Sequence, residues 1–217
     1  MKKSGFLFLL LILPFCEAAA HTINYVMEAQ PAHNVFIYYL GLGFTHILPL
    51  GYDHLLFVLG LFLLNPDWKS LLKQATCFTI AHTVTLILTA NDTIVAVPSV
   101  VEPLIALTIV FIAFENIYIK QATNFRYILV FAFGLIHGMG FAGALNEIGL
   151  PRNGFYTSLI GFNVGVELGQ ISFILLILFS VGLLKDKNWY RKRIAIPLSL
   201  ATGVIALWWT IERVFIL

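Results

Sequence analysis

Long apolar stretches alternate with short polar ones along most of this chain. Six of these stretches approach or exceed the roughly 20 helical residues needed to cross the hydrocarbon core of a bilayer. They cover residues 34–64, 70–90, 100–119, 127–145, 157–184 and 194–215. The pattern therefore predicts an all-α fold, a polytopic membrane bundle of about six transmembrane helices that occupies residues 34–217.

The first apolar stretch is too long for one straight helix, and Pro49 and Gly51 interrupt it. We expect a helix broken near Pro49–Gly51. Backbone groups freed by a break within a membrane are tolerated only where protein or a water-lined cavity satisfies them, so such a break suggests a site. The alternative is an amphipathic outer segment over residues 34–48, followed by a shorter span.

The N-terminus has a different pattern, in which two lysines precede an apolar stretch over residues 6–15 and three alanines follow. This is typical of a secretory signal peptide, here residues 1–20, cleaved after Ala20 to leave an outer segment over residues 21–33. An uncleaved first span is the alternative, although such a stretch covers only about half of the hydrocarbon core. After cleavage Cys77 would be the only cysteine, which excludes an internal disulfide.

Composition supports the membrane assignment. Of the 217 residues, 59% are hydrophobic and 11% are charged, and the mean hydropathy is +0.90; soluble domains carry about 25% charged residues. The net charge is only +2 and the basic residues form no patch with interleaved aromatics, so we do not expect nucleic acid as a partner.

The basic residues nevertheless orient the bundle, because cytoplasmic loops of membrane proteins are enriched in lysine and arginine. The outer segments carry only Arg152 and Arg213. The predicted inner loops carry Lys69, Lys73, Lys120, Arg126, Lys185, Lys187, Arg191, Lys192 and Arg193. We therefore expect a protein of the bacterial inner membrane with both mature termini outside.

Ionisable residues within spans are costly, by roughly 2.5 to 3.5 kcal/mol each on insertion scales, and usually serve a function. The densest group is His46, Asp53 and His54, which lies across the predicted break. Two imidazoles and a carboxylate suit a divalent ion of the nickel, cobalt, zinc or copper group. The alternative is that Asp53 caps a half-helix and the histidines form local hydrogen bonds.

His82 lies on a polar stripe of the second span that includes Thr79 and Thr83. Helical spacing places these residues within about half of the circumference. Threonine stripes commonly join helices, whereas a histidine among them favours a ligand or pathway role.

The fourth span contains His137 beside small residues at four-residue spacing, and the fifth repeats this glycine pattern. Small residues at that spacing permit close helix packing. A separate face of the fifth span carries Asn163, Glu167 and Gln170. We predict that His137 and Glu167 are metal ligands and that Asn163 and Gln170 line a transport path.

Glu102 precedes a proline at the start of the third span, where a carboxylate interacts favourably with a helix N-terminus. We expect this role first, and a place on the transport path second. Glu115 and Asn116, near the inner end of that span, and Glu212 with Arg213, near the outer end of the last, are expected to be interfacial or paired groups rather than ligands.

Several motifs resemble the HupE/UreJ family of hydrogenase and urease accessory membrane proteins. They lie at residues 43–57 (GFTHILPLGYDHLLF), 78–82 (FTIAH), 101–106 (VEPLIA), 133–138 (FGLIHG), 162–170 (FNVGVELGQ) and 209–213 (WTIER). The resemblance covers nearly the whole mature chain and implies a secondary permease for nickel or cobalt. It maps the family's first motif onto His46, Asp53 and His54, and its second onto His137 and Gly138.

The chain departs from the nickel-transporting members at two points. The spacing between His46 and Asp53 is one residue longer, and Phe133 stands where those members have a further histidine. These features resemble a divergent branch of the family. For such a branch, the resemblance implies the fold more strongly than it implies which metal is transported.

We expect the chain to be a permease, not an enzyme, that moves a divalent transition metal for metalloenzyme assembly and holds no permanent cofactor. Its expected partners are the lipid bilayer, the ion, and either a second copy of the chain or a metalloenzyme maturation factor. The rival hypotheses are a zinc-dependent intramembrane hydrolase, with Asp53 or Glu167 as general base, and a non-transporting assembly factor. Against the hydrolase, the sequence has no Gly-x-Ser-x-Gly or His-Glu-x-x-His motif.

Overall fold

The computed structural model describes residues 26–215, except for the side chains of residues 142–144 and 146–148. The predicted signal peptide lies outside this range. Helices are joined by short loops in the described part, which has no strand. Its main helices are α2 (Ala32–Ile47), α3 (Tyr52–Leu64), α4 (Trp68–Ala90), α5 (Pro98–Tyr118), α6 (Phe125–Ile148), α7 (Phe155–Ser180) and α8 (Ile196–Phe215). A 3₁₀ turn at Arg152–Gly154, another at Val181–Leu184 and a π turn at Arg191–Ala195 complete the described elements.

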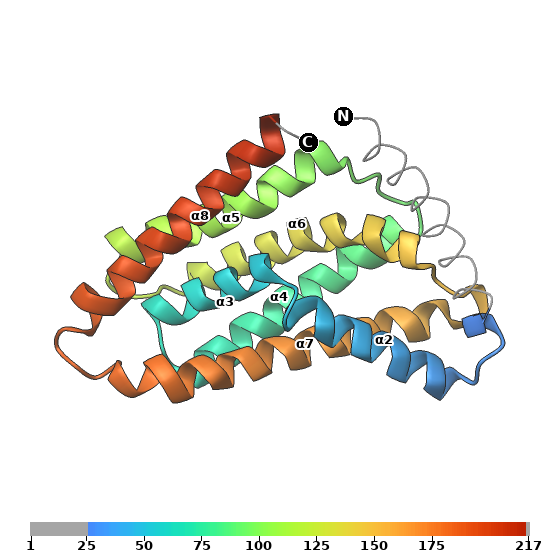
Figure 1. Ribbon diagram of the computed structural model, residues 1–217, viewed down its shortest axis with the longest axis horizontal. Helices are drawn as coiled ribbons and strands as arrows, with labels where there is room; N and C mark the ends of the chain where they lie inside the picture. Colours follow the sequence, from blue (N-terminus) through green and yellow to red (C-terminus); the bar gives the residue numbers. More distant parts are fainter. Residues whose placement is uncertain (1–25, 216–217) are drawn as a thin grey trace, which may run out of the picture.

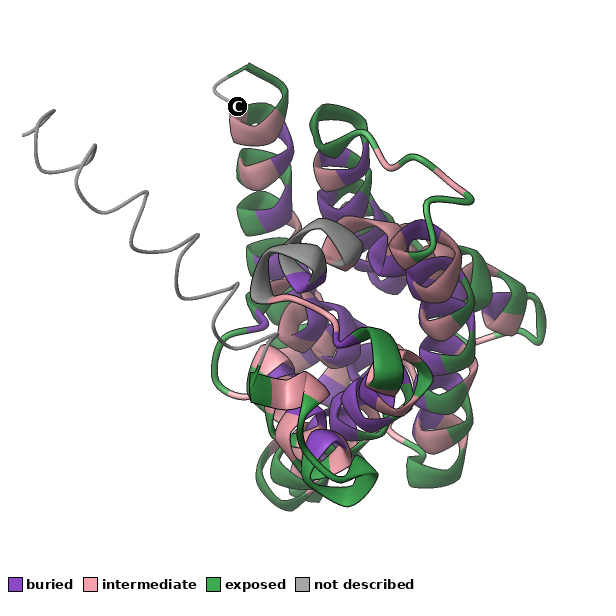
Figure 2. Cartoon of the chain, turned by 90° about the vertical axis from the view of Figure 1, so that its right-hand side faces the viewer, coloured by how far each residue is buried: buried purple, intermediate pink, exposed green. Residues whose placement is uncertain are grey.

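Successive long helices run in opposite directions, and the strongest contacts pair α2 with α7, α4 with α6, and α5 with α8 (Figure 1). The short helix α3 lies among these pairs and contacts α5, α7 and α8. Seen from one end, the buried faces of the helices turn towards each other and the exposed faces turn outwards (Figure 2). The outward faces carry large apolar side chains, such as Ile80, Phe111 and Leu176, as expected for a surface in contact with lipid.

The predicted all-helical membrane bundle is confirmed. Within the described residues, four helical segments are long and apolar enough to cross a membrane: Trp68–Ala90, Pro98–Tyr118, Arg152–Leu184 and Arg191–Phe215. The bent pair α2 and α3 makes a fifth if it counts as one span. The remaining predicted span coincides with α6, whose apolar part, Phe125–Phe141, is shorter.

The break in the first apolar stretch falls where the sequence predicts it. Helix α2 ends at Ile47, α3 begins at Tyr52, and the two are bent by 65°. The Leu48–Pro49 peptide bond between them is cis. Helix α2 packs closely along α7, so it belongs to the bundle, as the predicted broken helix requires.

Glycines set the close approach of paired helices. A Cβ added to Gly165 of α7 would overlap the backbone of α2 at Leu40, and one added to Gly43 of α2 would overlap the backbone of α7 at Phe162. A Cβ added to Gly138 of α6 would likewise overlap the backbone of α4 at His82. The small-residue pattern of the fourth and fifth spans is therefore explained by packing.

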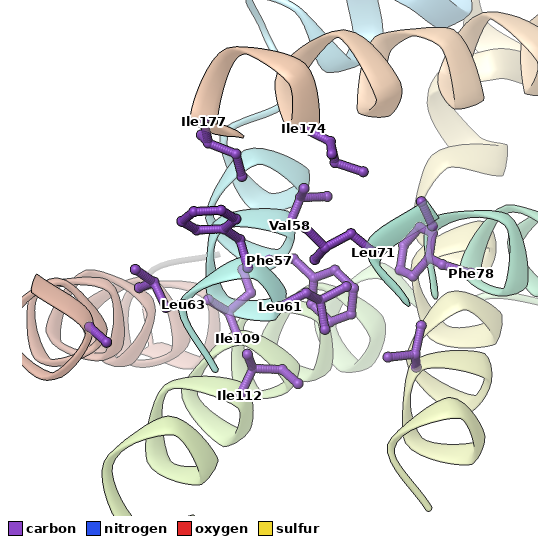
Figure 3. Close-up of a cluster of buried hydrophobic side chains, with 14 of the residues drawn as sticks. Phe57, Val58, Leu61, Leu63, Leu71, Phe78, Ile109, Ile112, Ile174 and Ile177 are labelled. Carbon is purple, nitrogen blue, oxygen red and sulfur yellow. The ribbon is translucent and has the colours of Figure 1, made fainter. Parts of the chain in front are cut away.

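Two apolar clusters fill the space between the helices. The larger cluster joins α3, α4, α5 and α7, and Figure 3 shows Phe57 and Leu61 near its centre, with Phe78 at one side and Ile174 facing them from α7. The smaller cluster lies between α2, α4 and α7 and includes Tyr39, Leu86 and Phe162.

Arg126, counted among the inner-loop residues from the sequence, is instead buried at the start of α6, with 1% of its side chain exposed. Its Nε lies 3.5 Å from the Glu115 carboxylate of α5, and its Nη2 donates to the carbonyl of Gly60 in α3 at 3.3 Å. Asn116 donates to the same carbonyl at 2.8 Å. Glu115 is thus a paired group, as expected, and this cluster ties three helices together.

Candidate metal-binding site

Three of the predicted histidines meet inside the bundle, each from a different helix. His46 lies in the last turn of α2, His54 in the first turn of α3 and His82 in the middle of α4. One ligand nitrogen from each ring lies within 4.8 Å of those from the other two. The break between α2 and α3 creates this arrangement, because it places residues separated by a proline turn on either side of one interior point.

The ring of His82 is held from behind by Asn163 of α7. Its Nδ1 lies 3.1 Å from Asn163 Oδ1, and Asn163 Nδ2 donates to the carbonyl of Leu159 at 2.8 Å. Because the amide nitrogen is used in that bond, the oxygen faces the ring and must accept from Nδ1–H. The Nε2 lone pair of His82 is then free to bind a ligand.

A fourth histidine, His137 of α6, has a similar hydrogen-bond partner in Thr108 of α5. The Thr108 hydroxyl donates to the carbonyl of Ile105 at 2.7 Å, so it accepts from His137 Nε2, which lies 3.1 Å away. This bond leaves the Nδ1 lone pair of His137 available. The ring centroids of His137 and His54 are 5.1 Å apart, so His137 borders the three-histidine group.

All four histidines present an unpaired nitrogen. Nε2 of His46, His54 and His82, and Nδ1 of His137, are buried and have no hydrogen-bond partner among the described side chains and backbone. An unpaired polar atom costs about 1 to 3 kcal/mol when buried. These atoms belong to the three-histidine group and to His137 beside it, so they are the donor atoms that a metal ion could use.

Aromatic rings surround the histidines. The His46 ring lies 4.0 Å from that of Phe141 and 5.6 Å from that of Phe162, centroid to centroid. The His54 ring meets Phe78 edge to face at 5.6 Å. These contacts restrict rotation of the histidine rings.

A cavity of about 490 Å³ reaches the histidines. Its lining includes His46, His54 and His137, and also three charged residues, Asp53, Glu102 and Arg213. The charged residues belong to the N-terminal parts of α3 and α5 and to the last turns of α8. The cavity therefore connects the histidine group with the end of the bundle where α5 begins and α8 ends (Figure 1).

Asp53 lies apart from the three-histidine group and is paired with an arginine. Both of its carboxylate oxygens accept from Arg213 Nη2, at 3.0 and 3.2 Å. Arg213 Nη1 also donates to the backbone carbonyl of Glu102 at 3.1 Å. Of the predicted first motif, the structure thus brings the two histidines together and gives the carboxylate a different partner. Glu102 lies beyond the first turn of α5, which begins with Pro98, and it is one of the residues that line the cavity.

The predicted polar faces of α4 and α7 meet in a ladder of three hydrogen bonds. Beyond His82 and Asn163, Thr79 Oγ1 donates to Gln170 Oε1 at 3.2 Å, and Thr76 Oγ1 donates to Glu167 Oε1 at 2.6 Å. Gln170 Nε2 and Glu167 Oε2 are buried without a partner in the described part of the chain. The ladder extends from the histidines towards the end of the bundle where α4 begins.

Two predicted site residues occupy other places in this arrangement. Thr83 donates to the carbonyl of Thr79 in its own helix at 2.7 Å, so its hydroxyl serves the backbone of α4. Glu167 lies along the ladder and not in the three-histidine group.

Sequence reasoning missed Thr108 and the partner of Arg213. Thr108 is the one hydroxyl residue deep within the third span, and this isolation in an apolar run was the available signal. Arg213 was expected to be an interfacial or paired group, and it is paired. Its partner, Asp53, is 160 residues away, and no local pattern indicates this pairing.

Fold and site together define a helical membrane protein with a histidine cluster in its interior. The family model described as HupE / UreJ protein matches residues 21–213, and the chain belongs to this family. Comparison with curated proteins gives no match, and no solved structure matches either.

Proposed function

We propose that this protein is a secondary permease for a divalent transition metal, with nickel or cobalt as the cargo, in support of metalloenzyme assembly. The observation that carries the proposal is the meeting of His46, His54 and His82, each with an unpaired nitrogen, inside a membrane bundle. Imidazole nitrogen suits nickel and cobalt, and membership of the HupE/UreJ family agrees with an accessory or transport role for these metals.

The spacing of the group suits a single ion. Two nitrogens on one ion with bonds of 2.0 to 2.1 Å are roughly 3.3 Å apart in tetrahedral geometry. The ligand nitrogens of His46, His54 and His82 lie within 4.8 Å of one another, so small movements of the rings can bring them onto one ion and release it again. A permease needs such reversible binding.

The ladder between α4 and α7 supports a path onward from the histidines. Beyond His82, Thr79 with Gln170 and Thr76 with Glu167 provide hydroxyl, amide and carboxylate groups between the two helices. Oxygen ligands hold these ions less firmly than several imidazoles do, so an ion can pass along them. We infer that the cargo moves from the cavity, through the histidines, to the ladder.

The orientation of the bundle follows from its charges. The loops at residues 119–124 and 185–190 lie at the same end of the molecule as the start of α4, and they contain basic residues. By the positive-inside rule this end faces the cytoplasm of a bacterial inner membrane, and the cavity faces outwards. A membrane-impermeant thiol reagent should label Lys187→Cys in inside-out vesicles and not in right-side-out ones. The reverse pattern would refute the orientation.

The test of transport is uptake of radioactive nickel or cobalt into proteoliposomes. Wild type should accumulate the ion, and His54→Ala should reduce the rate to that of empty liposomes. His33→Ala is the matched control, because His33 is exposed on the first turn of α2 and should leave uptake unchanged. Equal uptake by wild type and His54→Ala would refute the assignment.

The hydrolase hypothesis has less support from the geometry. A general base must be free to take a proton, and Asp53 is engaged by Arg213 while Glu167 accepts from Thr76. Metal analysis distinguishes the two functions: a hydrolase should purify with stoichiometric zinc that resists chelators, and a permease should lose its metal on dialysis.

A further inference from the structure

Arg213 places a positive charge inside the cavity that we assign to a cation. Its guanidinium holds both oxygens of Asp53, donates to the carbonyl of Glu102, and lies over the ring of Trp209 at 5.6 Å. These contacts join α8 to the first turn of α3 and to the second turn of α5. The side chains of Arg213 and Asp53 are 19% and 25% exposed, so the pair lies in the wall of the cavity and not on the open surface.

We propose that Arg213 sets the affinity of the cavity for its divalent cargo by holding the Asp53 carboxylate until an arriving ion displaces the guanidinium. This inference rests on the proposed transport function. It assigns to Arg213 the role of an affinity-determining residue, and to Asp53 a partner that changes between the empty and the loaded state.

The position of Asp53 makes this exchange feasible. Asp53 directly precedes His54 in the first turn of α3, and both residues line the cavity with Arg213. A carboxylate beside an imidazole ligand is attracted to a divalent ion more strongly than to a guanidinium, because the ion carries twice the charge in a smaller volume. An ion that enters the cavity towards His54 therefore competes with Arg213 for the oxygens of Asp53.

The charges of the cavity explain how competition between Arg213 and the ion keeps binding reversible. Among its lining residues, Asp53 and Glu102 are negative and Arg213 is positive. Without the arginine, two carboxylates would act with the histidines on one divalent ion, and release would be slow. The guanidinium offsets part of this attraction and reclaims Asp53 when the ion leaves, so binding stays reversible.

The experiment measures nickel binding to the purified full-length chain by titration calorimetry, and nickel release by stopped flow. Arg213→Gln removes the positive charge and should tighten binding about tenfold, with correspondingly slower release. Arg213→Lys keeps the charge and should remain within about twofold of wild type. A purely structural role for Arg213 predicts a lower melting temperature for Arg213→Gln and no gain in affinity, and that result would overturn the proposal.

The Asp53→Asn background tests whether the effect passes through Asp53. There, adding Arg213→Gln should change nickel affinity by less than about twofold. A tenfold gain in this background would show that Arg213 acts on another group and would contradict the proposal. This comparison also applies if Arg213→Gln alone fails to fold, because the double variant has no unpaired charge at these two positions.

His54→Ala in the same titration separates this inference from the proposed function. If His54→Ala binds nickel as wild type does, the metal site itself is refuted. If His54→Ala loses binding and folded Arg213→Gln binds no more tightly than wild type, only the role of Arg213 is refuted.

Discussion

The Nδ1 of His82 and the side-chain oxygen of Asn163 lie 3.1 Å apart across the interface of α4 and α7, and both side chains are buried. The amide of Asn163 is oriented by its own bond to the carbonyl of Leu159. This contact therefore fixes both the tautomer of His82 and the direction in which its free Nε2 points. In metal sites such a partner behind the ligand is worth a large share of the affinity.

Replacement of Asn163 by alanine should weaken nickel binding by about 10- to 100-fold, because the ring of His82 loses the acceptor that fixes its tautomer. Asn163→Asp keeps an oxygen acceptor and should bind within a few-fold of wild type. Titration calorimetry on both purified variants is the measurement. Equal weakening by the two substitutions would show that the contact acts through packing and not through the hydrogen bond.

Thr108 makes the corresponding contact with His137, and its hydroxyl accepts from Nε2 at 3.1 Å. Thr108→Val preserves the shape of the side chain but leaves a buried N–H without a partner, which should lower stability by about 1 to 3 kcal/mol. It should also weaken nickel binding if His137 contributes to the site. Thr108→Ser retains the hydroxyl and serves as the control. Wild-type stability and affinity in Thr108→Val would contradict the tautomer assigned to His137.

Much of the fold could be predicted from the sequence, because the bilayer restricts the possibilities so strongly. Apolar length identified the helices, and Pro49 with Gly51 identified the break between α2 and α3. Exposing the side chains of His46, His54 and His82 to lipid would cost free energy, which indicated that they face the interior of the bundle. The structure places them there. These inferences depend on local composition, which a single sequence contains.

The pairing of groups across helices could not be predicted in the same way. Helical periodicity places Asp53 and His54 on neighbouring faces, but the rotation of α3 against α8 decides which of them meets Arg213. That rotation is set by packing, including the glycine contacts of the bundle. Similarly, the sequence places the threonines of α4 in one polar stripe, yet their hydroxyls have different partners. Thr79 donates to a side chain of α7, and Thr83 donates to a backbone carbonyl of α4.

The glycine contacts predict a difference between two substitutions of the same kind. Gly165→Ala would push a methyl group into the backbone of α2 at Leu40, and we expect it to lower the melting temperature by several degrees or prevent folding. Gly41→Ala meets nothing within 4 Å and should be neutral or slightly stabilising, since alanine is the better helix former. Thermal unfolding in detergent compares the two. Equal effects would contradict the close packing of α2 against α7.

Glu167 should affect transport more than binding at the histidines. Its Oε1 accepts from Thr76 at 2.6 Å, and its Oε2 is buried and unpaired within the described chain. Glu167→Gln removes the negative charge from the ladder and should reduce nickel uptake about tenfold or more while changing nickel affinity by less than about threefold. Ser172→Ala is the control, because Ser172 is a half-buried position on the same helix whose hydroxyl donates to the carbonyl of Leu168 in its own helix. A large loss of affinity in Glu167→Gln would instead place this carboxylate in the metal site.

Phe57 and Phe78 separate the histidines from the end of the bundle where α4 begins. Phe57 follows His54 by about one turn on α3 and Phe78 precedes His82 by about one turn on α4, and because these helices run in opposite directions both rings lie on the same side of the site. Their centroids are 5.1 Å apart, and both side chains are fully buried. A dehydrated ion cannot pass two packed phenyl rings, so on the proposed route from the histidines to the ladder these rings would act as a closure in the described state.

Phe78→Ala should therefore open the path as well as destabilise the fold. The cavity left by the ring should cost about 3 kcal/mol or more, and passive nickel influx into proteoliposomes without an applied gradient of potential or protons should rise several-fold. Ile174→Ala is the matched control, since Ile174 belongs to the same apolar cluster on α7 (Figure 3) and should lower stability without raising influx. If both variants leak equally, the leak reflects loosened packing. If folded Phe78→Ala leaks no more than wild type, the rings do not form the closure.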